Sequence, residues 1–214
     1  MDIYSQLPAL DLATLNVKEK NLMKRYLVFV TVVVLTVVAS GLLLAQSNTQ
    51  VGSSPASTSD AGFAQEILKA HNLYRCQHGV PPLLWNADVA AYAQNWVNKM
   101  GRVVKHSKSY DSPLGPMGEN LYWGSAQPSG TDAVKSWYSE VSSYKFGSEG
   151  LSANRHFTAM IWKDAKYLGC GRANWTISCN YWSGTKTYDC TVPNMDGCYS
   201  QQVRPRSRDA EACK

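Results

Sequence analysis

The sequence predicts an α+β domain that is layered around an antiparallel sheet and stabilised by disulfides. Apolar residues recur at helical spacing in the part of the chain that begins near residue 61, and short strand-like apolar runs come later. Helices followed by strands are typical of this fold class. All six cysteines lie in the same part of the chain, which indicates a disulfide-braced domain outside the cytosol.

Three helices are expected in the first half of this part. The first is predicted over residues 61–75, because apolar side chains recur there at helical spacing: Phe63, Ile67, Ala70 and Tyr74. Asn86 is a good N-cap for a second helix, which Gly101 ends. A third helix is predicted over residues 131–141.

Three short strands are expected after these helices, over residues 157–162, 168–173 and 177–182. Residues 105–118 and 147–154 contain serine, glycine and other loop-forming residues, and we expect loops there. Beyond Tyr188 the chain is polar, and it is expected to wrap the surface of the domain.

An uncharged apolar segment over residues 26–45 is long enough to span a bilayer, which takes about 20 residues. Lys24 and Arg25 stand before it and favour a cytosolic position for that end. One interpretation is a transmembrane signal anchor, with residues 1–25 as a short cytosolic tail. The other is a secretory signal peptide, if translation begins at Met23. Both interpretations predict a single-pass or secreted protein whose domain lies outside the cytosol.

The composition argues against a nucleic-acid-binding protein. The formal net charge is +5, and charged residues make up 17% of the chain. Apart from Arg204, Arg206 and Arg208, the positive charges are spread along the chain, whereas nucleic-acid binders carry a denser basic stripe. We therefore expect no nucleic-acid partner and interpret the three arginines as part of a solvated tail.

Four polar residues are candidates for chemistry: His106, Glu119, Glu140 and His156. Each is weak evidence by itself, because a lone histidine is more often structural and a lone helical glutamate usually faces water. The sequence pattern alone does not bring the four together.

Several short blocks, in order, resemble the signature blocks of the superfamily of cysteine-rich secretory, antigen 5 and pathogenesis-related 1 proteins (the CAP superfamily). These blocks are residues 70–75 (AHNLYR), 118–121 (GENL), 156–162 (HFTAMIW) and 179–181 (CNY). The resemblance implies a three-layer α-β-α sandwich with a central cleft. It also implies a CAP domain over residues 62–189, followed by a cysteine-containing extension over 190–214. Residues 46–61 are rich in serine, threonine and small residues, so we expect a flexible linker or a trimmed mature N-terminus there.

The same resemblance implies that His106, Glu119, Glu140 and His156 line the cleft together. Family members hold a divalent metal, often zinc, through the two histidines, and the two glutamates would be cleft partners. Neutral imidazoles suit Zn²⁺, and carboxylates ligate or orient bound water. Two histidines alone would give an open, weakly binding site.

Residues 137–146 and 156–163 also resemble the Golgi-associated and yeast sterol-binding branches, which implies contact with sterols or other lipids in a groove. We therefore expect an extracytosolic binding protein. Two alternatives stay open: a metal-dependent hydrolase that uses the four residues, and a defence or virulence factor that acts through a protein partner. The sequence lacks the H-E-x-x-H and G-x-S-x-G motifs, which disfavours an enzyme.

Other positions bear on this resemblance. Arg155 stands where the family commonly has a small residue, and its charge would weaken cation binding in the cleft. Cys170 and Cys179 resemble a family disulfide, whereas the pairing of the other four cysteines stays open. Asn174 begins an N-x-T glycosylation sequon.

Overall fold

The computed structural model describes the following residues: 24, 58–101, 103–124, 127–149 and 152–214. The predicted apolar span over 26–45 lies outside them, as do nearly all of the predicted tail and most of the predicted linker. Within the described part of the chain, no helix is long and apolar enough to cross a membrane. The last four residues of the predicted linker, 58–61, are helical and open the first described helix.

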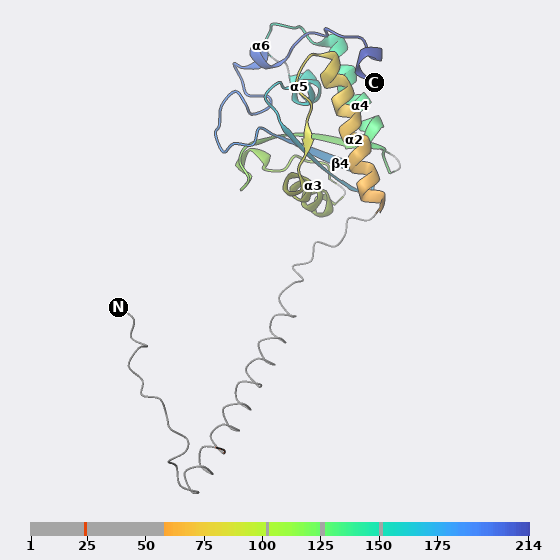
Figure 1. The fold of residues 1–214 in the computed structure, drawn as a ribbon. Helices are drawn as coiled ribbons and strands as arrows, with labels where there is room; N and C mark the ends of the chain where they lie inside the picture. The colour runs from red at the N-terminus through yellow and green to blue at the C-terminus, as the bar shows by residue number, and fades with distance from the viewer. Residues whose placement is uncertain (1–23, 25–57, 102, 125–126, 150–151) are drawn as a thin grey trace, which may run out of the picture. The chain divides into compact units, whose positions relative to one another are not determined.

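The elements follow one another along the chain as shown in Figure 1. They are α2 (Thr58–Gln77), β1 (Leu84–Trp85), α3 (Ala87–Met100), β2 (Met117–Trp123), α4 (Gly130–Ser139), α5 (Arg155–Ile161), β3 (Tyr167–Ala173), β4 (Thr176–Trp182) and α6 (Tyr199–Gln202). Short 3-10 helices cover Ser109–Asp111, Glu140–Ser143, Ser152–Asn154 and Glu211–Cys213.

The strands form one sheet in the order β1-β3-β4-β2, so β2 is an edge strand. The pairs β2–β4 and β3–β4 are antiparallel, which agrees with the prediction of an antiparallel sheet, although β2 itself was not predicted. The two-residue strand β1 runs parallel to β3 at the other edge, so the sheet is mixed, with an antiparallel centre.

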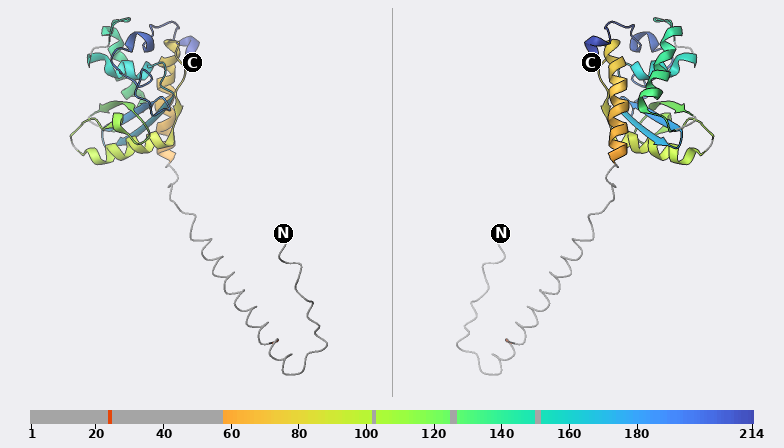
Figure 2. Two further views of the ribbon diagram at one scale, coloured as in Figure 1. Left: turned by 90° about the vertical axis from the view of Figure 1, so that its left-hand side faces the viewer. Right: turned by 90° about the vertical axis from the view of Figure 1, so that its right-hand side faces the viewer.

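Helices cover both faces of the sheet, which confirms the three-layer α-β-α sandwich: α3 lies on one face, and α2, α4 and α5 lie on the other (Figures 1 and 2). Two glycines on β3 allow α3 to approach closely. A Cβ at Gly169 would lie 2.1 Å from the backbone nitrogen of Ala90, and one at Gly171 would lie 2.4 Å from Cα of Gln94. The contact between α3 and the sheet therefore requires residues without side chains at these positions.

The predicted strand over residues 157–162 is wrong, because residues 155–161 form helix α5. Every residue from Phe157 to Trp162 is fully buried, so the run has no polar face, and neither helical nor strand periodicity is visible in it. Strand β2 was not predicted, because its Gly118-Glu119-Asn120 stretch interrupts the apolar pattern.

The predicted N-cap Asn86 is confirmed, since its side chain accepts hydrogen bonds from the backbone N–H groups of Asp88 and Val89 at 3.0 Å.

Three disulfides join all six cysteines. The predicted pair Cys170–Cys179 links β3 to β4. The other pairs, which the sequence left open, are Cys76–Cys213 and Cys190–Cys198. The segment from residue 190 onward packs on the sandwich, with Tyr199 and Val203 buried in the main core.

Candidate functional site

Glu119 on β2 holds His106, which lies in the segment after α3. His106 Nδ1 donates to Glu119 Oε2 at 2.8 Å, and the same oxygen accepts from the backbone N–H of Ser107 at 2.8 Å. Glu119 Oε1 accepts from Ser178 Oγ at 3.2 Å. Because Nδ1 faces a carboxylate, it carries a proton, so Nε2 is the nitrogen that can present a lone pair to the edge of the sheet.

Glu140, the residue that caps α4, holds His156 at the start of α5 in the same way. His156 Nδ1 donates to Glu140 Oε1 at 2.6 Å, and the backbone N–H of Phe157 donates to Glu140 Oε2 at 3.0 Å. Asn154 Nδ2 donates to the Glu140 carbonyl at 3.0 Å and fixes the end of α4. The His156 ring also stacks on Trp137, with ring centroids 6.5 Å apart.

The two histidine–glutamate pairs come from opposite faces of the sheet. Glu119 pairs in register with Asn180, and the next residue, Asn120, pairs with Cys179. Since side chains alternate along a strand, Glu119 and Asn120 point to opposite faces. The pairs can face one space only because β2 is an edge strand, around which side chains from both layers converge.

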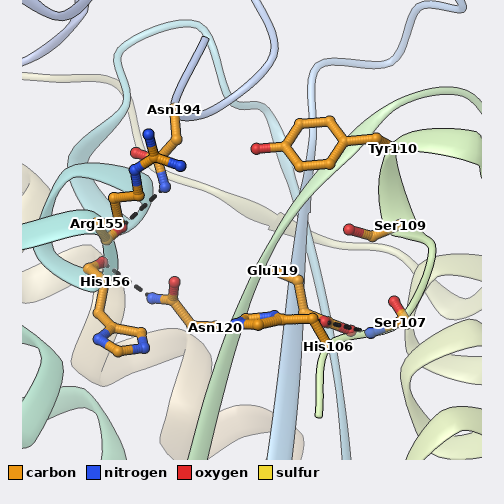
Figure 3. Close-up of a pocket in the computed structure, with 9 residues that line it drawn as sticks. All are labelled: His106, Ser107, Ser109, Tyr110, Glu119, Asn120, Arg155, His156 and Asn194. Atoms are coloured by element: carbon orange, nitrogen blue, oxygen red, sulfur yellow. Dashed lines mark hydrogen bonds and ion pairs between the residues drawn. The ribbon is translucent and has the colours of Figure 1, made fainter. Parts of the chain in front are cut away.

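A cavity of about 220 Å³ lies at this edge, and we call it the edge cavity (Figure 3). Its lining residues are His106, Ser107, Ser109, Tyr110, Glu119, Asn120, Arg155, His156 and Asn194. It therefore brings together three of the four predicted site residues. Glu140 is not among these lining residues; it contacts the edge cavity only through His156, whose Nδ1 it accepts from.

A buried hydrogen-bond chain supports the floor of the edge cavity. Asn120 Nδ2 donates to the His156 carbonyl at 2.9 Å and to Tyr181 Oη at 3.0 Å. Tyr181 Oη in turn donates to His71 Nε2 at 2.9 Å, and His71 Nδ1 donates to the Ile67 carbonyl at 2.7 Å. Burial lowers the pKa of His71 to about 4 and raises that of Tyr181 well above its usual value, so both groups are neutral.

The wall opposite the floor comes from the segments around Tyr110 and Asn194. Tyr110 Oη donates to the Pro193 carbonyl at 3.1 Å, and burial raises the pKa of Tyr110 to about 12. Asn194 has a left-handed backbone (φ 64°), donates to the Arg155 carbonyl at 2.9 Å and accepts from Thr158 Oγ1 at 2.6 Å. These bonds tie the segment that contains Asn194 to the start of α5.

Residues 68–184 match the family described as the cysteine-rich secretory protein family. The chain belongs to this family. It is similar to human Golgi-associated plant pathogenesis-related protein 1, with 43% identity over 115 residues, which are 52% of this chain and 73% of the human protein. It is also similar to pathogenesis-related leaf protein 6 of Solanum lycopersicum, with 37% identity over 139 residues, 58% of this chain and 82% of that protein. Secreted protein RBT4 of Candida albicans is 40% identical over 133 residues, and the match covers 57% of this chain and 35% of that protein.

Two crystal structures show the same fold. The structure of Na-ASP-1 superposes with a TM-score of 0.52 at 22% identity, covering 65% of this chain and 43% of that chain. The structure of NaASP2 with Zn²⁺ superposes with a TM-score of 0.50 at 21% identity, covering 70% of this chain and 93% of that one. At these identities the likeness concerns the fold alone.

The donor set of this member of the cysteine-rich secretory protein family fits a two-histidine cation site. Both imidazoles have Nδ1 fixed by a carboxylate, which is the usual arrangement behind a metal-ligating histidine and leaves Nε2 as the ligand atom. Among the described residues, no group of three or more histidine, cysteine, aspartate or glutamate side chains is placed to hold a metal.

Sequence reasoning missed Tyr110, Asn120 and Asn194 as lining residues of the edge cavity. Asn120 follows Glu119 directly and lies in the GENL block, so that block contained a usable signal. Tyr110 and Asn194 stand in polar segments with no local pattern, and only the fold brings them to the cavity.

The aromatic residues of the two segments that resemble the lipid-binding branches, 137–146 and 156–163, are mostly packed inside the domain. Tyr144 is buried, and its ring contacts Phe146 and Phe157 edge-on, with centroids 5.0 and 5.4 Å apart. Trp123, by contrast, is 60% exposed at the end of β2.

A second cavity, of about 830 Å³, lies along α2 and shares no lining residue with the edge cavity; we call it the α2 groove. It is lined by Gln65, Glu66, Leu68, Lys69, Ala70, Asn72, Leu73, Thr131, Cys213 and Lys214.

Proposed function

We propose that this domain is an extracytosolic binding protein that holds a divalent cation between His106 and His156. One observation carries the proposal: both imidazoles line the edge cavity, and a carboxylate fixes Nδ1 of each, at 2.8 and 2.6 Å. Pre-oriented neutral imidazoles are good ligands for Zn²⁺ and similar cations.

A location outside the cytosol is supported by the cysteines. All six are joined in disulfides, which persist in oxidising compartments and are rare in the cytosol. The word "secreted" in the name of the Candida albicans relative agrees with this location. Asn174 lies on the exposed turn between β3 and β4, where a glycan added to its sequon would meet solvent.

The surroundings of the two carboxylates favour binding over hydrolysis. Glu119 accepts hydrogen bonds on both of its oxygens, from His106, Ser107 and Ser178. Glu140 also accepts on both oxygens, from the His156 ring and the backbone of Phe157. A general base needs a free oxygen within reach of the proton that it removes, so these glutamates suit orientation of the imidazoles better than activation of water.

Calorimetric titration of the full chain with Zn²⁺ or Co²⁺, in a buffer without carboxylates or phosphate, tests this proposal. We expect saturable binding at one site, weakened at least about tenfold in His106→Asn and in His156→Asn, since each removes half of the protein ligands. Glu211→Gln, which changes an exposed carboxylate in the C-terminal 3-10 helix, is the matched control and should bind normally. Unchanged affinity in both histidine variants would contradict the proposal.

The α2 groove supports a second candidate function, the binding of a sterol or a similar lipid. Its volume of about 830 Å³ lies within the range of small-molecule sites, about 300–1,000 Å³, whereas the edge cavity is smaller than this range. Leu68, Ala70 and Leu73 of α2 give it an aliphatic wall with polar residues at the rim.

Binding of a fluorescent sterol such as dehydroergosterol to the full chain tests the second candidate. Leu73→Glu should weaken saturable binding at least about tenfold, because it places a charge on an apolar wall. Leu84→Glu is the matched control, since Leu84 is 59% exposed on β1 and does not line the groove. Equal sterol binding by both variants, or no saturable binding by the unaltered chain, would rule out the groove as the sterol site.

A further inference from the structure

Arg155 is an unusual residue for the wall of a cation site. Its side chain lines the edge cavity, and the next residue is His156, a ligand in the proposed function. The ion-pair partner of Arg155 is Asp196, at 3.6 Å, with the two side chains 49% and 88% exposed. An exposed pair of this kind contributes little to stability, so the guanidinium is free to bind another anion.

The charge of Arg155 also acts across the edge cavity. Tyr110 lies on the opposite wall, and the positive charge of Arg155 partly opposes the rise that burial produces in the pKa of Tyr110 (Figure 3). A dication held at His106 and His156 would experience the same positive field, which disfavours it. A bound anion would remove this conflict.

Asn120 supplies a second, independent sign of a ligand. It is 1% exposed, it lines the edge cavity, and its Oδ1 has no hydrogen-bond partner among the described residues. Both protons of Nδ2 are used, by the His156 carbonyl and by Tyr181, so the amide orientation is fixed. A buried acceptor without a donor is costly, and a ligand that brings an N–H or O–H group would satisfy it.

The volume of the edge cavity limits the ligand to a small group. At about 220 Å³ it lies below the usual range of about 300–1,000 Å³ for drug-sized ligands. The complementary features are a cationic donor at Arg155 and a neutral acceptor at Asn120. Together they call for an anionic group with a hydrogen-bond donor close beside it.

We propose that the edge cavity binds a carboxylate whose neighbouring atom carries an N–H or O–H group, with Arg155 on the carboxylate and Asn120 Oδ1 accepting from the donor. Free hydroxy or amino acids and the C-terminus of a peptide share this chemistry. The proposal deepens the proposed function, because the carboxylate offsets the charge of Arg155 and helps a cation to bind at the two histidines. By thermodynamic linkage, a bound cation must then raise the affinity for the carboxylate by the same factor as the carboxylate raises the affinity for the cation.

The test uses the full chain, treated with a chelator and then dialysed, and measures binding by calorimetry. The first probes are glycolate, which has the neighbouring hydroxyl, and acetate, which lacks it. We expect glycolate to bind at least about tenfold more tightly than acetate, because only glycolate satisfies Asn120 Oδ1. Equal affinities, or no glycolate binding, would overturn the proposal. N-acetyl-glycylglycine is the peptide probe: tighter binding than glycolate supports the C-terminus of a peptide as the source of the carboxylate, and weaker binding supports a free acid.

Substitutions at Arg155 give the decisive pattern. Arg155→Gln should weaken glycolate binding at least about tenfold, whereas Arg155→Lys, which keeps the charge, should retain part of it. Arg155→Gln should also raise the affinity for Zn²⁺ about fivefold in carboxylate-free buffer, because a nearby positive charge is removed. Arg204→Gln, an exposed arginine outside the edge cavity, is the matched control and should change neither affinity. A merely structural role for Arg155 would not move the two affinities in opposite directions.

The two proposals fail in different ways. If Zn²⁺ binds with the expected histidine dependence and glycolate does not bind, the carboxylate proposal is wrong and the cation site stands. If glycolate binds through Arg155 and Zn²⁺ does not bind, the cation site is wrong and the carboxylate proposal stands for the metal-free chain.

Discussion

Tyr181 on β4 donates its hydroxyl proton to Nε2 of His71 on α2, at 2.9 Å, in the buried layer behind the edge cavity. His71 Nδ1 is already a donor to the Ile67 carbonyl, so the imidazole must be neutral to accept from Tyr181. The other side of the tyrosine hydroxyl accepts from Asn120, which lines the cavity. The cavity floor therefore rests on an imidazole that is neutral only above its own pKa.

This arrangement predicts that the free energy of unfolding falls in mild acid. Burial lowers the pKa of His71 from 6.5 to about 4. Between these pH values the unfolded chain binds a proton and the folded chain does not, so stability decreases as the pH falls from 6.5 toward 4. The full loss from this group is roughly 3 kcal/mol. Urea denaturation at pH 7 and pH 5 should show the decrease.

The variant His71→Gln isolates this contribution, because an amide can donate to Ile67 and accept from Tyr181 without titrating near pH 5. Its stability should depend less on pH than that of the unaltered chain over the same interval. His78, whose pKa burial also lowers, adds a decrease of the same sign that both proteins share. Identical pH profiles for the two proteins would show that His71 is not the titrating group.

Arg75 should be among the most sensitive positions for stability. It is fully buried on α2, and its guanidinium donates to backbone carbonyls beyond the helix: Pro81, Met160, Trp162, Lys163 and Ala165. Arg75→Met would leave these carbonyls without their charged donor and should lower the free energy of unfolding by about 3–5 kcal/mol. Denaturation with urea measures the change. Arg208→Met, at an exposed arginine, should lie within about 0.5 kcal/mol of the unaltered chain.

The contact between α3 and the sheet predicts opposite effects for two glycine substitutions. At Gly171 an alanine Cβ would lie 2.4 Å from Gln94 of α3, so Gly171→Ala should destabilise the domain by roughly 2–3 kcal/mol. At Gly62, on α2, nothing lies within 4 Å of the added atom. Gly62→Ala should therefore stabilise by about 0.5–1 kcal/mol through helix propensity. Thermal unfolding of both variants measures these effects, and a change of the same sign in both would contradict this packing account.

Local signals in the sequence were sufficient for some elements and misleading for others. Asn86 identified the start of α3, because capping depends on neighbours within three residues. Helix α5 could not be distinguished from a strand, because a fully buried run such as Phe157–Trp162 has no polar face in either conformation. Burial is a property of the whole fold, so no local pattern decides such a segment.

The site shows the same limit. The resemblance in sequence named His106 and His156, and the structure places both on the edge cavity. Each carboxylate orients one imidazole by accepting from its Nδ1. This role could not be predicted, because the two pairs face one cavity only when β2 is the edge strand of the sheet. Asn120 Oδ1 has no hydrogen-bond partner in the part of the chain that the structure describes, because its amide is oriented by His156 and Tyr181, which are 36 and 61 residues away in sequence. No local pattern in the sequence indicates this.

Removal of Cys76–Cys213 should cost more stability than removal of Cys190–Cys198, whereas only removal of Cys190–Cys198 should weaken binding at the edge cavity. Cys76–Cys213 closes a separation of 137 residues and Cys190–Cys198 one of 8, so chain entropy gives about 5 and about 2.5 kcal/mol. Replacing the first pair by alanine should therefore lower the free energy of unfolding more. The second pair, however, brackets Asn194, which lines the cavity and bonds to the start of α5. Its replacement should weaken Zn²⁺ or glycolate binding, while loss of the first pair should not. If both double variants lost binding in proportion to stability, Asn194 would have no separate role in shaping the cavity.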